Sequence, residues 1–175
     1  MKQFKRPDKQ NLLVFLLLLI TVSAVCVSVW ALFFRTSETA LTPDYAPKVE
    51  DHAQPIPGDT AAGNEAQPGS GSVSITYSNQ VNIRLGERTA KLLFANPGRS
   101  NQDIVLQIVI QDTVVVQSGT LKPGNQISSL SLLSGAKNQL AAGVYNGMFN
   151  VLYYDPVSGE KAIVNTEIPI TITVK

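Results

Sequence analysis

The side chains that could carry out chemistry are few and far apart in this chain of 175 residues. Its single histidine, His52, follows Glu50 and Asp51, and such a group could in principle bind a metal ion. The surrounding segment is rich in proline, glycine and acidic residues and lacks apolar periodicity, so we interpret His52 as a solvated side chain. Residues 72–175 contain neither histidine nor cysteine, which excludes a Ser/His/Asp or Cys/His arrangement and a zinc site there.

The other candidates for chemistry are carboxylates close to predicted turns: Asp103, Asp112, Asp155 and Glu160. Oxygen atoms between Asp155 and Glu160 could hold calcium weakly, but this segment lacks the alternating acidic residues of a calcium-binding loop. An Asp-Pro pair followed by Gly159 is what a β-hairpin loop requires. We therefore predict a hairpin loop here, no metal or other cofactor, and no enzymatic activity. The formal net charge of +1 argues against a nucleic-acid partner.

The element that must position the rest of the chain is the apolar stretch Leu12–Phe34, which contains no charged residue. As a helix it would be about 35 Å long, more than the roughly 30 Å apolar thickness of a bilayer. Lysine and arginine are concentrated in residues 1–11, so the positive-inside rule places that segment in the cytoplasm. We expect one transmembrane helix in the cell membrane, followed by an extracytoplasmic region. The alternative is a signal peptide cleaved after Ala24, although apolar sequence continues to Phe34.

Residues 35–71 differ in composition from the segments on both sides. Prolines and glycines alternate with Ala, Asp, Glu and Gln, and no apolar periodicity is present. This composition is typical of a disordered linker. We predict a flexible tether that holds the following domain near the membrane.

From residue 72 onward, apolar and polar residues alternate with a period of two, which indicates β-strands. Predicted strands occupy 73–77, 81–83, 90–94, 103–111, 113–117, 127–132, 144–154 and 161–174, with a loop or helical turn at 134–139. Seven or eight short strands separated by turn signals describe an antiparallel β-sandwich over residues 72–175. Pro169 cannot donate a backbone hydrogen bond, so its side of the last strand should face solvent or lie at a sheet edge.

Leu140, Gly143 and Tyr145 have the spacing of a tyrosine corner, in which the tyrosine hydroxyl bonds to the backbone a few residues upstream. The stretch from Leu140 to Asp155 resembles the late strands of immunoglobulin-like and fibronectin-type-III-like domains of bacterial surface proteins. The resemblance covers residues 73–174 as a pattern, without the cysteine pair and the tryptophan of true immunoglobulin domains. It implies an all-β, immunoglobulin-like sandwich and favours spacer, adhesion or subunit-contact roles over catalysis.

Two neighbouring strands are predicted to carry an apolar strip on their outward face. If the tyrosine corner fixes the inward face, the outward apolar residues of strands 103–111 and 144–154 are Val105, Val109, Met148, Leu152 and Tyr154. Exposed apolar strips often mark partner surfaces, so we expect a protein partner to bind this strip. The alternative is that the loop at 134–139 or a twisted neighbouring strand covers it.

These observations predict a non-enzymatic interaction domain tethered to a bacterial envelope by one membrane helix. It would act at the cell surface or as an accessory subunit of a pilus, secretion or wall-associated complex, and a homo-oligomer is left open. The alternative function is a module that binds carbohydrate or an anionic wall polymer. Its candidate contacts are Arg84, Arg88, Lys91 and Arg99, although scattered cations are also typical of a solvated face.

Overall fold

The computed structural model of the chain describes residues 15, 17–25, 42–59 and 74–175. Residues 17–25 are helical, whereas most of the other residues of the predicted membrane helix Leu12–Phe34 lie outside the described residues. Within the described ranges, no helix is both long enough and apolar enough to cross a membrane. Residues 40–175 form one structural unit, which is the domain considered below.

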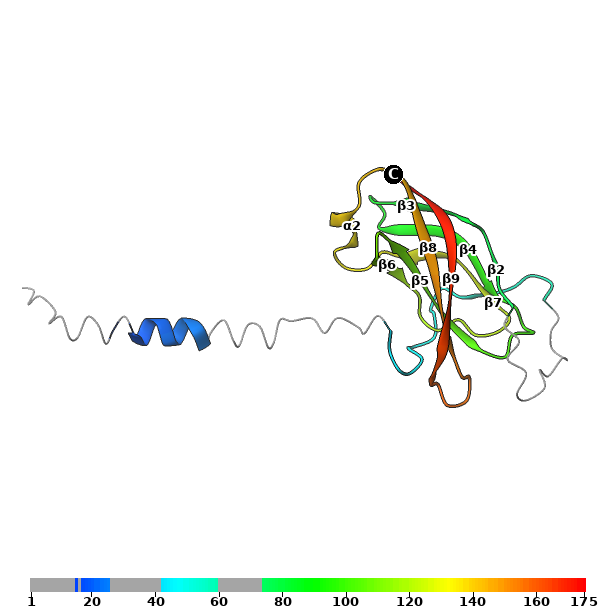
Figure 1. The fold of residues 1–175 in the computed structure, drawn as a ribbon, viewed down its shortest axis with the longest axis horizontal. Coiled ribbons are helices and arrows are strands. Elements are labelled where there is room, and N and C mark those ends of the chain that lie inside the picture. The colour runs from blue at the N-terminus through cyan, green and yellow to red at the C-terminus, as the bar shows by residue number, and fades with distance from the viewer. Residues whose placement is uncertain (1–14, 16, 26–41, 60–73) are drawn as a thin grey trace, which may run out of the picture. The chain divides into compact units, whose positions relative to one another are not determined.

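The domain consists of β-strands and one short helix (Figure 1). The elements are β1 (Gln54–Pro55), β2 (Thr76–Tyr77), β3 (Gln80–Arg84), β4 (Thr89–Asn96), β5 (Asp103–Ile110), β6 (Thr113–Gln117), β7 (Asn125–Ser131), α2 (Ala136–Gln139), β8 (Gly143–Tyr154) and β9 (Lys161–Val174). The strands predicted from the period of two are all present, the first of them shortened to β2. The segment 134–139, predicted as a loop or a helical turn, contains α2.

The strands form two layers that are joined through β3. One layer contains β1, β7, β4 and β3, and the other contains β9, β8, β5 and β6, in that order. β3 pairs antiparallel with β4 and parallel with β9, so it closes one side of the sandwich. The predicted all-β sandwich is confirmed, although the parallel β3–β9 pair departs from the purely antiparallel prediction.

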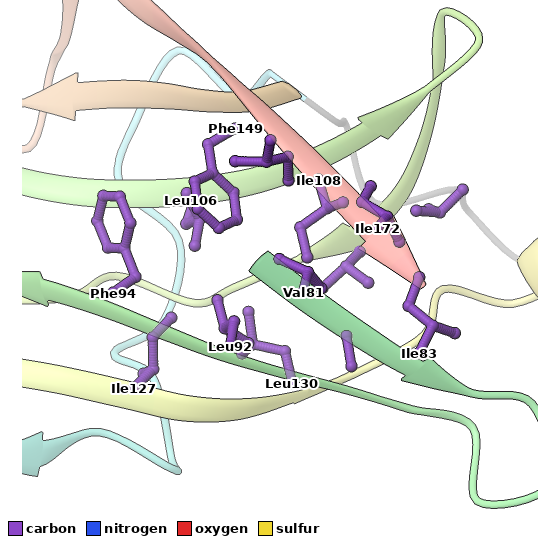
Figure 2. Close-up of a cluster of buried hydrophobic side chains, with 14 of the residues drawn as sticks. Val81, Ile83, Leu92, Phe94, Leu106, Ile108, Ile127, Leu130, Phe149 and Ile172 are labelled. Atoms are coloured by element: carbon purple, nitrogen blue, oxygen red, sulfur yellow. The ribbon is translucent and has the colours of Figure 1, made fainter. Parts of the chain in front are cut away.

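The core lies between the two layers and takes alternate residues from each of them (Figure 2). Ile104, Leu106 and Ile108 of β5 are fully buried, as their period of two predicted. Phe94 of β4 and Phe149 of β8 meet across the layers edge to face, with ring centroids 5.6 Å apart. Contacts of this kind fix how the two layers pack. The packing in turn determines which residues of β5 and β8 face outward.

Pro169 lies at an open edge of β9, as predicted. β8 pairs along most of β9, whereas β3 pairs only with its last part, from Thr171 to Val174. The N–H group of Thr171 donates to the carbonyl of Asn79 on the β3 side. Strand alternation turns the nitrogen of Pro169 to the same side, where no strand of the described structure pairs with it.

The prediction that residues 35–71 form a disordered linker is wrong for residues 42–59, which pack on the sandwich. Val49 pairs with Thr120 in an isolated bridge, and β1 pairs with the first residues of β7. Backbone pairing of this kind needs no alternation of apolar side chains, which is why composition alone did not reveal it. The domain therefore includes residues 42–59 as well as the predicted strands, whereas residues 35–41 and 60–71 of the predicted linker lie outside the described residues.

The residues on either side of the undescribed segment 60–73 both contact the turn that follows β4. The carboxylate of Asp59 accepts a 2.8 Å hydrogen bond from the N–H group of Gly98. The guanidinium group of Arg99 donates a 2.7 Å hydrogen bond to the hydroxyl of Ser74. Asp59 and Ser74, the described residues on either side of 60–73, are thus bonded to the adjacent residues Gly98 and Arg99.

Candidate interaction surface

The predicted strip lies on the outer face of the layer that contains β9, β8, β5 and β6. Residues paired across neighbouring strands share a face, so the register divides this outer face into rows. The Met148 row is apolar and contains Val114, Val109, Met148 and Pro169. The Gln107 row is polar and contains Gln117, Gln107, Asn150 and Glu167. The Leu152 row begins with Val105 and Leu152, and Tyr154 lies beyond it on the same face.

The Leu152 row is covered, so the predicted exposure of this part of the strip is wrong. Val105, Leu152 and Tyr154 are fully buried and form one apolar cluster, against which Ala46 packs. The cover is residues 43–50, which we call the strap. Neither of the covers considered from the sequence, the loop at 134–139 or a neighbouring strand, is the one found, because the strap comes from the predicted linker.

The first half of the strap is bonded to Tyr154 and to the β8–β9 hairpin. The hydroxyl of Tyr154 donates a 3.0 Å hydrogen bond to the carbonyl of Pro43. The N–H group of Lys161 donates to the carbonyl of Asp44 at 2.9 Å, and that of Ala46 donates to the carbonyl of Gly159 at 2.7 Å. Burial, and to a lesser extent the charge of Asp44, raises the pKa of Tyr154 above its ordinary value of 10.0.

The second half of the strap is bonded to the connection between β6 and β7. Thr120 donates its N–H group to the carbonyl of Lys48 at 2.9 Å and accepts at its own carbonyl from the N–H group of Glu50 at 3.0 Å. The Glu50 carboxylate accepts a 2.6 Å hydrogen bond from the N–H group of Gly119. A Cβ atom at position 119 would lie 2.6 Å from the Lys48 carbonyl oxygen and 2.9 Å from the Glu50 Cα, so this contact requires glycine.

The Met148 row is the part of the predicted strip that stays accessible. Val109 and Met148 are half-buried, and Pro169 is exposed at the edge of the sheet. The neighbouring Gln107 row is closed by side-chain hydrogen bonds, from Gln107 to Gln117 at 2.9 Å and from Asn150 to Gln107 at 2.8 Å. Of the five predicted strip residues, the structure therefore leaves Val109 and Met148 at the surface, separated from the strap by a polar row.

The tyrosine corner predicted at Leu140, Gly143 and Tyr145 has the expected hydrogen bonds. The Tyr145 hydroxyl donates to the carbonyl of Ala141 at 3.0 Å and accepts from the N–H group of the same residue at 3.3 Å. Leu140 packs against the main core, and β8 begins at Gly143. The corner thus fixes the start of β8 and, through it, the position of Met148 on the outer face.

Two of the four carboxylates singled out in the sequence, Asp103 and Asp155, have structural partners. Asp103 is buried beside Lys122, with 3.1 Å between the carboxylate oxygen and the ammonium nitrogen. The Asp155 carboxylate accepts hydrogen bonds from the N–H groups of Ser158 and Val157, in that order of effect, which lowers the pKa of Asp155. Gly159 has a φ of 72°, as the predicted hairpin loop requires. Among the described residues, no group of three or more His, Cys, Asp or Glu side chains is placed to hold a metal ion.

The basic residues proposed for polymer binding do not form one cluster of free charges. Arg84 is paired with Glu87 at 2.8 Å, and this hydrogen bond holds the pKa of Glu87 below its usual value. Arg99 is bonded to Ser74. These contacts support the interpretation of this region as a solvated face.

His52 lies at a cleft of about 450 Å³ on the edge of the other layer. The cleft is lined by Asp51, His52, Ala53, Gln54, Thr89, Ser128, Ser129, Leu130 and Ser131. Sequence reasoning missed this cleft because the strap and β1 bring the histidine next to hydroxyl groups from β4 and β7 that are far away in the sequence.

Sequence reasoning also missed the strap itself, for which a signal was available. A strip of large apolar side chains is covered either by a partner or by another part of the same chain, so a covering segment was one of the two possibilities. The proline-rich segment before the strands contains Ala46, Ala53 and Ile56, each of which is at least partly buried in the structure.

No protein-family model and no curated protein matches the chain. Among solved structures, it is similar to the periplasmic chaperone SfaE, with 11% identity, 59% of this chain and 56% of that chain covered, and a TM-score of 0.36. It is also similar to the YadV chaperone, with 19% identity, 59% and 51% covered, and a TM-score of 0.33. A third similar structure is AggA, the major subunit of aggregative adherence fimbriae type I from Escherichia coli, with 13% identity, 59% and 95% covered, and a TM-score of 0.29. The matched regions span about half of the length of each chaperone.

Proposed function

We propose that this protein is a non-enzymatic interaction domain held on the outer side of a bacterial cell membrane by one N-terminal helix. The proposed anchor is Leu12–Phe34, with residues 1–11 in the cytoplasm. The domain would serve at the cell surface or as an accessory subunit of an envelope assembly such as a pilus, secretion or wall-associated complex. The observation that carries the proposal is the strap, which makes the segment after the anchor an integral part of the β-sandwich.

Because the strap is part of the domain, the tether in this proposal is shorter than the linker predicted from the sequence. A linker of residues 35–71 would let the domain search widely, whereas residues 35–42 can span at most about 28 Å even when fully extended. A short tether keeps the domain at high effective concentration beside other membrane-bound proteins. Weak contacts are then sufficient for association, which suits a small partner surface.

The proposed partner surface is the Met148 row. It is a band of apolar side chains that crosses four strands and is bordered by the hydrogen-bonded Gln107 row. Apolar residues surrounded by polar ones are the usual composition of a transient protein interface. A partner with a small apolar protrusion could cover Val109 and Met148 without displacing the strap.

Photo-crosslinking in intact membranes tests the proposal, with a photoreactive residue in place of Met148. The matched control is position 93, because Leu93 is an exposed apolar residue on β4, in the other layer. A discrete adduct with another envelope protein from position 148 alone would support the proposed surface and identify the partner. Equal adducts from both positions, or none, would contradict it, and a self-adduct would indicate a homo-oligomer.

A second candidate function is carbohydrate binding at the cleft beside His52. Hydroxyl groups of Thr89, Ser128, Ser129 and Ser131 line this cleft, and such groups can exchange hydrogen bonds with sugar hydroxyls. Co-sedimentation of the protein with purified bacterial cell walls tests it. Binding that is lost in Ser131→Leu but kept in Thr113→Leu, an exposed change on β6, would favour this function. If charge reversal at Arg84 and Arg88 weakens binding as well, the ligand is an anionic polymer.

A further inference from the structure

Four exposed apolar side chains lie on the β8–β9 hairpin or on the strap residue paired with it, and we call them the tip: Tyr45, Val157, Ile163 and Val164. Val157 is 95% exposed and Ile163 is fully exposed. A register shift in the β8–β9 pairing between Leu152 and Tyr154 accompanies this exposure of Ile163 and Val164. Tyr45 of the strap is paired with Glu160 of the hairpin, so its exposed ring belongs to the same end of the domain.

The tip is also the place where the chain enters the domain. Pro43 and Asp44 are bonded to Tyr154 and Lys161, the last residue of β8 and the first of β9. The C-terminal end of β9 pairs with Gly143, the first residue of β8, so the C-terminus lies at the opposite end of these strands (Figure 1). The tip therefore lies at the end of the domain that Pro43 and Asp44 contact.

We propose that the tip contacts the lipid surface of the membrane, with Val157 and Ile163 entering the headgroup layer and Tyr45 lying at its boundary. This inference rests on the proposed membrane anchor, because residues 35–42 leave at most about 28 Å of chain between that anchor and the tip. Isolated apolar side chains on a hairpin suit shallow insertion, and tyrosine is common at the lipid–water boundary. A shallow contact would orient the domain and direct the Met148 row toward neighbouring proteins.

The charges around the tip determine which lipid surface suits it. The charged residues at this end of the domain are three acidic ones and one basic one: Asp44, Asp155, Glu160 and Lys161. Their net charge is −2. Such a tip is repelled by anionic lipids and held by apolar contact alone. We therefore expect its insertion into anionic vesicles to increase with salt, the reverse of the behaviour of a basic membrane-binding segment.

The experiment uses the full chain with Cys26→Ser, reconstituted in phosphatidylcholine vesicles, and an environment-sensitive fluorophore on a single introduced cysteine. The label is placed at Val157→Cys, and the matched control is Val144→Cys, an exposed valine at the other end of β8. At position 157 we expect blue-shifted emission and about three-fold less quenching by aqueous iodide than at position 144. In phosphatidylglycerol vesicles, the protection of position 157 should rise with salt.

The outcomes separate this inference from the proposed anchor. Protein that stays in the vesicles after alkaline carbonate extraction, but shows equal quenching at both positions, would overturn the tip contact and leave the anchor intact. Release by carbonate would overturn the anchor and the tip contact together. Protection of position 157 that disappears when each vesicle holds a single protein molecule would overturn the lipid contact in favour of a second copy of the chain.

Discussion

The hydroxyl of Tyr154 donates a 3.0 Å hydrogen bond to the carbonyl of Pro43, which lies 111 positions earlier in the chain. This bond and the packing of Ala46 on Val105, Leu152 and Tyr154 convert a segment with the composition of a linker into part of the domain. The strap thereby covers most of an apolar strip and leaves the Met148 row as its accessible remainder.

Replacing Gly119 by alanine should weaken the attachment of the strap. The added Cβ would lie 2.6 Å from the Lys48 carbonyl oxygen, so the strap must shift, at a cost of about 1–3 kcal/mol as in other overpacked sites. Chemical denaturation of the detergent-solubilised chain measures the free energy of unfolding, and limited proteolysis should show faster cleavage within the strap. Gly86→Ala is the control, because no heavy atom lies within 4 Å of its added Cβ, and equal effects of both changes would contradict the role of Gly119.

The stability of the domain should fall at high pH through Tyr154. Burial raises the pKa of this phenol in the folded chain above its ordinary value of 10.0, so the folded state favours the neutral form. The resulting stability is fully present below pH 10 and is lost as the pH rises from there through the higher pKa of the folded state. Tyr154→Phe should show a smaller loss between pH 9 and about pH 11.5 in denaturation experiments. Identical pH profiles for the two proteins would show that Tyr154 does not titrate with unfolding.

Tyr145→Phe should destabilise the domain by about 0.5–1.5 kcal/mol, because it removes the hydrogen bonds of the corner hydroxyl to Ala141 and leaves the ring in place. Thermal unfolding of the two proteins in the same detergent measures this difference. Tyr77→Phe is a suitable control, since Tyr77 is partly exposed and contacts Phe149 through its ring. A loss for Tyr77→Phe as large as that for Tyr145→Phe would argue against a special role of the corner.

Shortening segment 60–73 to about five glycine and serine residues should change the free energy of unfolding by less than about 1 kcal/mol. Its flanking residues Asp59 and Ser74 are bonded to the adjacent residues Gly98 and Arg99, so a short connection can still join them. Denaturation midpoints of the shortened and full chains provide the measurement. A large loss of stability would mean that residues of this segment contribute directly to the fold.

The features that the sequence determined by itself are local ones. The strands of the sandwich, the hairpin loop at Asp155–Gly159 and the tyrosine corner follow from a period of two, from turn residues and from a fixed spacing within a few positions. The inward face of β5 followed as well, because alternation is a property of the strand itself. The membrane helix at Leu12–Phe34 rests on hydropathy alone and stays a prediction.

Only the tertiary structure decided which residues far apart in the sequence contact each other. Glu50 reaches Gly119 across 69 positions, and Tyr154 reaches Pro43 across 111. Each contact joins one side chain, the Glu50 carboxylate or the Tyr154 hydroxyl, to a backbone group. Because every segment carries such backbone groups whatever its side chains are, the residue pattern does not identify the partner. For this reason the exposure of Leu152 and the linker assignment of residues 42–59 were both wrong, while Val109 and Met148, away from the strap, remained at the surface.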